Sequence, residues 1–109
     1  MNSLISEYTD KFIEQLKTSD EYKEYNNQLE VIKHFPDLMS QINQYRQENF
    51  IIQNQYESDE LYDKMEEFSN KYEYLMENPR AYDFIHAEAA FCKMMQEVNI
   101  RMIEGLNFQ

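Results

Sequence analysis

The sequence predicts an all-α protein: an antiparallel helical bundle of about five helices with a long C-terminal helix, in a single domain spanning residues 1–109. The chain contains 1 Gly and 2 Pro among many Glu, Gln, Lys, Met and Leu residues, so turn formers are few and helix formers are many. Apolar residues recur at alternating spacings of four and three, which is the seam pattern of a helical bundle. The 9 Tyr and 7 Phe favour a packed core over disorder.

The first two helices are separated by a capping signal. The first is expected to run from Asn2 or Ser3 to Lys17. Ser19 or Asp20 then supplies an N-cap, and acidic residues in the following turn suit the helix dipole. Each helix presents an apolar stripe, formed by Leu4, Ile5, Tyr8, Phe12 and Leu16 in the first and by Tyr22, Tyr25, Leu29 and Ile32 in the second.

Two prolines mark the starts of the third and fifth helices. Proline suits the first turn of a helix, and it pushes the preceding residue out of the α region. Pro79 follows Asn78, a good cap, and predicts a new helix, whereas Pro36 is either a kink or a reversal. The segment "YESD" predicts a short turn, with Ser58 or Asp59 capping a fourth helix that reaches Asn78 and lies antiparallel to the third. The stripes are Leu38, Ile42, Tyr45, Asn49, Ile52 and Tyr56, then Leu61, Met65, Phe68, Tyr72 and Leu75.

The fifth helix is expected to be longer than anything that can cover it. From Pro79 it continues for about 28 residues, or ~42 Å, whereas the fourth helix reaches only ~30 Å. A single chain should therefore leave part of its apolar stripe exposed, which predicts self-association through this helix, most simply as a homodimer. The alternative is that the first two helices cover the stripe within one chain. The candidate interface residues are Phe84, Glu88, Phe91, Met95, Val98 and Met102.

Glu88 is the one charged residue on that stripe. A buried carboxylate costs several kcal/mol unless it is paired or hydrogen-bonded. The expected partners are a tyrosine hydroxyl, Lys93, Arg101 or a basic residue of a second chain. We interpret Glu88 as a residue that fixes helix register or recognises a partner, because no second catalytic group accompanies it.

The charge of the chain argues against several classes of partner. The net charge of −11 repels phosphate backbones and anionic membrane surfaces, so no direct nucleic-acid binding is expected. No segment is apolar enough for membrane insertion, and the N-terminus lacks the features of a signal peptide. A single cysteine, Cys92, excludes an internal disulfide. These features predict a cytoplasmic protein.

No catalytic, cofactor or metal site is predicted. His34 and His86 lie on different helices, and neither has a glutamate at the spacing that a di-iron bundle site needs. His86 lies off the stripe and is expected at the surface. Cys92 has apolar neighbours and is interpreted as a small buried hydrophobe. Met94, Met95 and Met102 are interpreted as core packing. An enzyme or metal carrier built on Glu88, Cys92 and a histidine is the least favoured hypothesis.

Soft sequence features along nearly the whole chain resemble the YlbF/YmcA family of small helical bacterial proteins. They lie in "TSDEYKEYNNQLEVIKHFPDLMSQI" and "ENPRAYDFIHAEAAFCKMMQEVNIRMIEGLNF". The matching positions are Ser19 with Glu21 and Tyr22, Pro36 to Leu38, Asn78 and Pro79, Ala87 and Glu88, Phe91, Glu97 and Val98, and Glu104 and Gly105.

The resemblance implies a helical, usually dimeric regulatory adaptor without catalysis of its own. It implies action with family paralogues and a membrane-anchored endoribonuclease in mRNA maturation linked to competence, biofilm formation or sporulation. One branch of the family carries a cysteine-bearing C-terminal extension tied to iron–sulfur cluster binding. This sequence ends at Gln109 with Cys92 as its one cysteine, so cluster ligation is not carried over. The alternative function is a self-contained homo-oligomer with a role unrelated to RNA.

Overall fold

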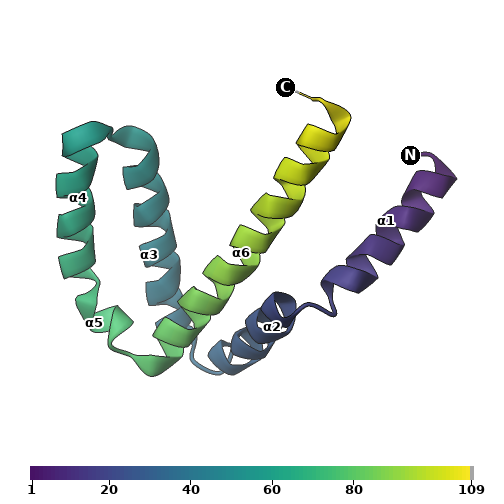
Figure 1. Ribbon diagram of the computed structural model, residues 1–109. Helices are drawn as coiled ribbons and strands as arrows, with labels where there is room; N and C mark the ends of the chain where they lie inside the picture. Colours follow the sequence, from purple (N-terminus) through teal and green to yellow (C-terminus); the bar gives the residue numbers. More distant parts are fainter. Residues whose placement is uncertain (109) are drawn as a thin grey trace.

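The computed structural model describes residues 1–108 and confirms an all-α fold: within that range there are six helices and no strand (Figure 1). The helices are α1 (Ser3–Leu16), α2 (Asp20–Ile32), α3 (Pro36–Gln55), α4 (Ser58–Lys71), α5 (Glu73–Met76) and α6 (Pro79–Leu106).

Side-chain caps begin three of these helices, and two of them, Ser19 and Asn78, are the predicted ones. The side chain of Asn2 accepts hydrogen bonds from backbone N–H groups at the start of α1, and Ser19 accepts one from the N–H of Tyr22 at 3.1 Å. The Asn78 side chain accepts from the N–H of Arg80 at 3.0 Å. Each cap satisfies backbone donors that the first helical turn leaves unpaired. Pro36 and Pro79 are both the first residue of a helix, so Pro36 begins a separate helix and does not kink a continuous one.

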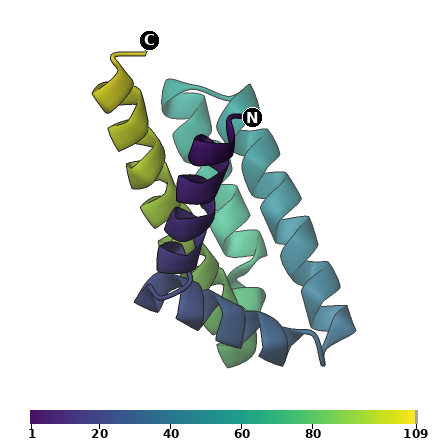
Figure 2. The same ribbon diagram turned by 90° about the vertical axis from the view of Figure 1, so that its right-hand side faces the viewer.

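The helices are arranged as a hairpin with a long arm on one side. α3 and α4 lie side by side and antiparallel, as the short turn between them predicts, and α6 rises from the base away from the hairpin (Figure 1). α2 crosses the base and packs along the first part of α6 (Figure 2). α1 points away from the base on the far side of α6. The molecule is consequently open and flat, with extents of 49 × 38 × 21 Å.

The core lies at the base, where α2 to α6 meet. Its buried residues are Ile32, Ile42, Phe68, Tyr72, Leu75, Ala81 and Phe84. Aromatic rings carry much of the contact, including Tyr45 against Phe68 at 5.0 Å between ring centroids. α1 contributes no buried residue to this core.

The predicted fourth helix is wrong in two details. It does not run unbroken to Asn78, because the chain departs from helical geometry at Tyr72 (φ −102°, ψ 13°) and continues as the short α5. The bend lets both Tyr72 and Leu75 reach the core, where they are 3% and 1% exposed. The N-cap is Glu57 and not Ser58 or Asp59, since the tight turn places Ser58 in the left-handed region as the first helical residue.

Candidate functional site: the exposed faces of α6

The six predicted interface residues lie at successive heights along α6, and their burial changes with height. Phe84, near the base, is 1% exposed. Phe91 is half-buried and stacks on Tyr25 of α2, with 5.4 Å between ring centroids. Farther along, Val98 is half-buried, whereas Met95 is 36% exposed and Met102 is 51% exposed. The chain therefore covers the first half of the stripe itself and leaves the second half open.

The lengths of the helices explain this division. α2 has 13 residues and α6 has 28, so α2 spans ~20 Å of a helix that is ~42 Å long. α1 does not cover the remainder, because none of its own residues is buried. The alternative that the first two helices cover the whole stripe in one chain is therefore wrong. The expectation that Met95 and Met102 are core residues is also wrong in the single chain, and Met94 is half-buried.

Glu88 is paired within its own chain. Its carboxylate accepts two hydrogen bonds from Arg46 of α3, one from Nε at 2.9 Å and one from the terminal nitrogen Nη2. The guanidinium also lies 5.2 Å from the centroid of the Phe84 ring. The partners expected within the chain, namely a tyrosine hydroxyl, Lys93 or Arg101, were wrong, and the basic residue of a second chain stays a prediction. Sequence spacing gives no signal for Arg46, because 42 positions separate the two residues and Arg46 lies off the α3 stripe.

The Arg46–Glu88 pair lies in a groove between α3 and α6. The groove is lined by Tyr45, Arg46, Asn49, Phe50 and Gln53 of α3 and by Ile85, Glu88, Ala89, Cys92 and Gln96 of α6. Cys92 is exposed, so the expectation of a buried thiol is wrong. Its position explains the error: Cys92 lines this open groove, and α6 leans away from α3 above the base (Figure 1).

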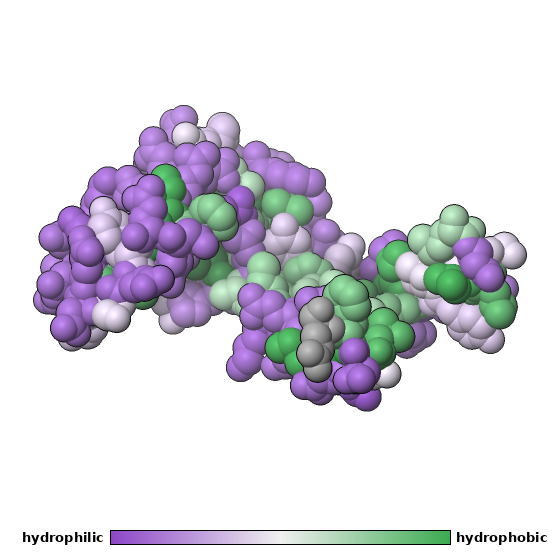
Figure 3. All heavy atoms as spheres, turned by 90° about the horizontal axis from the view of Figure 1, so that it is seen from above, coloured by the Kyte–Doolittle hydropathy of each residue, from purple (hydrophilic) through white to green (hydrophobic). Residues whose placement is uncertain are grey.

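A second apolar face lies on the other side of α6, where α1 stands apart from it. Phe12 of α1 lines a shallow hollow with Val98, Arg101 and Met102 of α6. In Figure 3 hydrophobic side chains gather toward the end of α6 and on α1 at the right, whereas the α3–α4 hairpin at the left is largely hydrophilic. We call this face the arm surface and define it as Leu4, Ile5, Tyr8, Phe12 and Ile13 of α1 with Met95, Val98, Met102 and Leu106 of α6.

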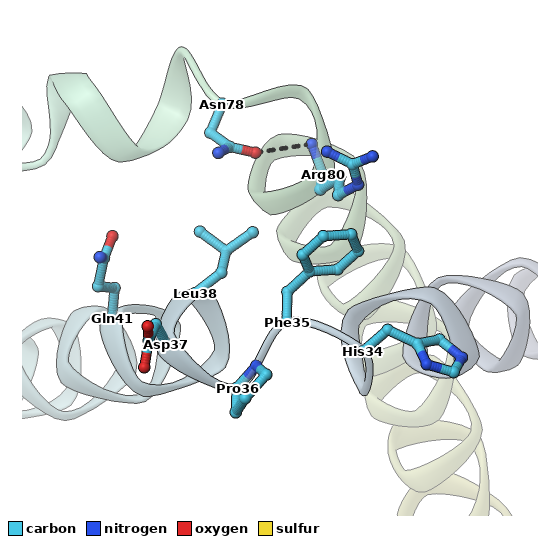
Figure 4. Close-up of a pocket in the computed structure, with 8 residues that line it drawn as sticks. All are labelled: His34, Phe35, Pro36, Asp37, Leu38, Gln41, Asn78 and Arg80. Atoms are coloured by element: carbon cyan, nitrogen blue, oxygen red, sulfur yellow. Dashed lines mark hydrogen bonds between the residues drawn. The ribbon is translucent and has the colours of Figure 1, made fainter.

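A third hollow lies at the base, where the starts of α3 and α6 meet (Figure 4). The Arg80 guanidinium lies 4.3 Å from the centroid of the Phe35 ring, and Asn78 caps α6. These contacts join the two proline corners. Asn78 and Arg80 are thus used in holding the fold.

The strongest electrostatic perturbation lies on the hairpin, away from the arm surface. Lys71 of α4 donates a hydrogen bond of 2.6 Å to Glu48 of α3, and this bond lowers the pKa of the Glu48 carboxyl. Burial, together with the nearby Glu48 carboxylate, raises the pKa of Tyr72 to about 12. Burial also raises the pKa of Tyr45. The cluster cross-links the two hairpin helices.

Two features are absent from the part of the chain that the structure describes. Across residues 1–108, no three His, Cys, Asp or Glu side chains are grouped so that they could hold a metal ion. None of the helices in that range combines the length and apolar content needed to cross a membrane. His86, expected at the surface, is exposed there.

Comparison with known proteins gives one match. The family model described as "Control of competence regulator ComK, YlbF/YmcA" matches residues 5–107. No curated protein and no solved structure matches the chain. The matched span begins within α1 and ends just after α6, so it includes both helices that form the arm surface.

Proposed function

Because the chain belongs to the YlbF/YmcA family, whose description gives it a role in controlling the competence regulator ComK, we propose that this protein is a non-catalytic regulatory adaptor. It acts in the cytoplasm by binding other proteins. Its partners are a second copy of itself, family paralogues and an endoribonuclease. The process it serves is mRNA processing linked to competence, biofilm formation or sporulation.

The observation that carries the proposal is the open second half of α6. Met102 and Leu106 are 51% and 78% exposed, whereas Phe84 in the first half of the same stripe is 1% exposed. A monomer rarely leaves a contiguous apolar face of this kind in water, and such faces mark interaction sites. Self-association through Met95, Val98 and Met102 follows, with Phe84, Glu88 and Phe91 fixing the position of α6 from within the chain.

The Arg46–Glu88 pair gives the adaptor a defined shape. It is the polar link between α3 and α6, and it sets the direction in which α6 leaves the base. A partially buried, bidentate arginine–carboxylate pair specifies geometry better than apolar contacts do. In this proposal Glu88 fixes the register of α6 and does not act as a general base.

Affinity capture from the protein's own cells tests the adaptor role. The tagged chain is compared with Met102→Asp, which places a charge on the open half of α6, and with Tyr62→Asp as a control. Tyr62 lies on α4, 72% exposed and outside the arm surface. Recovery of a family paralogue or an endoribonuclease with the wild type and with Tyr62→Asp, but not with Met102→Asp, supports the proposal. The capture is made after nuclease treatment, so that RNA cannot bridge the proteins.

The opposite result is equally informative. If the wild type recovers only itself, the adaptor role fails and a closed homo-oligomer is the better description. If both variants recover the same partners as the wild type, α6 is not the surface through which the adaptor works.

A further inference from the structure

The groove between α3 and α6 lies outside the surface used by the proposed self-association. It has a volume of about 520 Å³, compared with about 470 Å³ for the hollow at the base and about 340 Å³ for the hollow beside α1. Half of its lining residues are apolar or aromatic, namely Tyr45, Phe50, Ile85, Ala89 and Cys92. Phe50 is 69% exposed in this position. An apolar hollow with a few polar groups that stays open to water is a candidate binding surface.

The residues that line the α3–α6 groove form a row along each of the two helices. The row on α6 has spacings of four, three and four, and consists of Ile85, Ala89, Cys92 and Gln96. A row on α3 has spacings of four and three, and consists of Arg46, Phe50 and Gln53. Such spacings place side chains on one side of a helix, and rows of this kind accept the side chains of another helix. Because α6 leans away from α3 above the base (Figure 1), the two rows leave room for a third helix between them.

The size of the side chains in the groove also suits a helix. Ala89 and Cys92 are small and exposed, so the backbone of a packed helix can come close to α6. Phe50 lies on the α3 side and offers a large aromatic surface, which is a common centre of binding energy at interfaces. The row from Ile85 to Gln96 is ~16 Å long, which matches about 11 residues, or three turns, of an occupant helix.

The groove is nearly uncharged although the protein is acidic. The charged residues among its lining, Arg46 and Glu88, are paired with each other. α3 has two acidic and one basic residue and α6 has four and three, so the rest of the chain carries −9 of the net charge of −11. A helix in the groove would therefore need an apolar inner face, because an unpaired charge is costly to bury. Its outer face would lie in the negative field of the whole molecule, which favours lysine and arginine there.

We propose that the α3–α6 groove binds an amphipathic helix of a different protein, with an apolar stripe against the groove and basic residues on its outer face. Helices with apolar residues at i, i+3, i+4 and i+7 dock in hydrophobic grooves in this way. A second copy of the chain is a poor occupant, since each of α1 to α6 has a net negative charge. This inference rests on the adaptor role in the proposed function, and it gives the adaptor a partner surface separate from the arm surface.

Two synthetic peptides of about 14 residues, long enough for three helical turns with their flanks, test the occupant. Both have leucine at i, i+3, i+4 and i+7, and they differ in having lysine or glutamate on the outer face. Fluorescence anisotropy measures their binding to the full chain. The lysine peptide is expected to bind, and the glutamate peptide to bind at least about 10-fold more weakly, with the difference shrinking as salt rises. Equal binding of the two peptides overturns the basic character assigned to the occupant.

A pair of neighbouring variants tests the position of the site. Ala89→Trp fills the groove without changing the charge, and Ala90→Trp is its matched control. One residue along a helix turns the side chain by about 100°, and Ala90 lines a different hollow with Glu21 of α2. Both alanines are exposed, so neither substitution disturbs the core. Ala89→Trp should weaken binding of the lysine peptide at least about 10-fold, whereas Ala90→Trp and Met102→Asp should leave it unchanged. Equal affinities in the two tryptophan variants mean attraction by net charge alone and overturn the inference.

Cys92 reports directly on the groove, because it is the one cysteine of the chain and lines that groove. Saturation with the lysine peptide should slow the alkylation of Cys92, and an unchanged rate overturns the inference.

The natural occupant is identified with a photoreactive phenylalanine analogue in place of Phe50, cross-linked in the protein's own cells. A cross-linked segment of another protein that has an apolar stripe and a basic outer face supports the inference. A cross-link to a second copy or to an acidic segment overturns it. If neither peptide binds while the affinity capture described above still recovers a partner, the groove inference is overturned and the adaptor role stands.

Discussion

Neutralising Glu88 is the most direct test of what positions α6. Glu88→Gln keeps the shape of the side chain but replaces a bidentate, charge-assisted pair with a neutral contact to Arg46. Hydrogen bonds to charged groups contribute about 1.5–3 kcal/mol, and fully exposed pairs contribute about 0–1 kcal/mol. The Arg46 and Glu88 side chains are 36% and 25% exposed, which is between these two limits. We therefore expect a loss of about 1–2 kcal/mol in the free energy of unfolding.

Thermal and urea unfolding, followed by far-ultraviolet circular dichroism, measure this loss. For a domain of this size the expected fall in Tm is about 5–10 °C. Glu48→Gln is the matched control, because its Lys71 partner is 61% exposed and donates a single hydrogen bond. That control should lose no more than about 0.5 kcal/mol.

A double-mutant cycle isolates the pair from the other contacts of Arg46. Arg46 also donates to the side chain of Asn43 at 3.0 Å and lies against Phe84, so Arg46→Met alone removes more than the ion pair. The coupling energy between Arg46→Met and Glu88→Gln should be at least about 1 kcal/mol. A coupling below about 0.5 kcal/mol, or an equal loss in Glu88→Gln and Glu48→Gln, would refute the role assigned to the pair.

Four further predictions concern the core, the hairpin and the thiol. Leu75→Ala should destabilise the fold by about 2–5 kcal/mol in urea unfolding, because Leu75 is 1% exposed in the core; a loss below about 1 kcal/mol would contradict the bend before α5. The pKa of Glu48 is lowered in the folded state, so its contribution to the free energy of unfolding should be full above its unfolded pKa of 4.5. This contribution should be lost as the pH falls through the lowered pKa of the folded state. A Glu48→Gln variant should lack this acid-dependent part of the stability. The pKa of Tyr72 is raised to about 12, so its contribution to the free energy of unfolding should persist through pH 10 and be lost as the pH approaches 12. In an absorbance titration, one tyrosine should ionise at a higher pH than the others. Cys92 should react with a thiol reagent in the native protein nearly as fast as in urea; strong native protection would place it in an interface.

The fold was largely predictable because its signals are local. Ser19 and Asn78 cap the helices they were expected to cap, and both prolines start helices, since these effects act within four residues of the chain. The stripes predicted for the third and fourth helices supply the buried residues Ile42, Phe68 and Leu75. Periodicity predicts which side of a helix is apolar, and that side is what packs.

The errors arose where tertiary contacts decide the outcome. Tyr72 continues the stripe in sequence, but the helix bends there because the core needs the side chains on both sides of the bend. Glu88 finds Arg46 because the hairpin brings α3 beside α6, and no spacing within either helix encodes that pairing. Cys92 has apolar neighbours in sequence but lines an open groove in the fold. Its burial depends on how far apart α3 and α6 lie at that height, which the sequence of α6 alone does not encode. The predicted interface on α6 stays a prediction.

The pairing of α2 with α6 also gives the chain an order of folding events. Tyr25 and Phe91 stack across a loop that contains all of α3, α4 and α5, and closing a long loop costs more entropy than closing a short one. The α3–α4 hairpin closes through only Tyr56 and Glu57, so it forms early and shortens that loop. Folding then proceeds from the middle of the chain outward. α6 next docks on α2, and α1, which contributes no buried residue, adds no contact to the core.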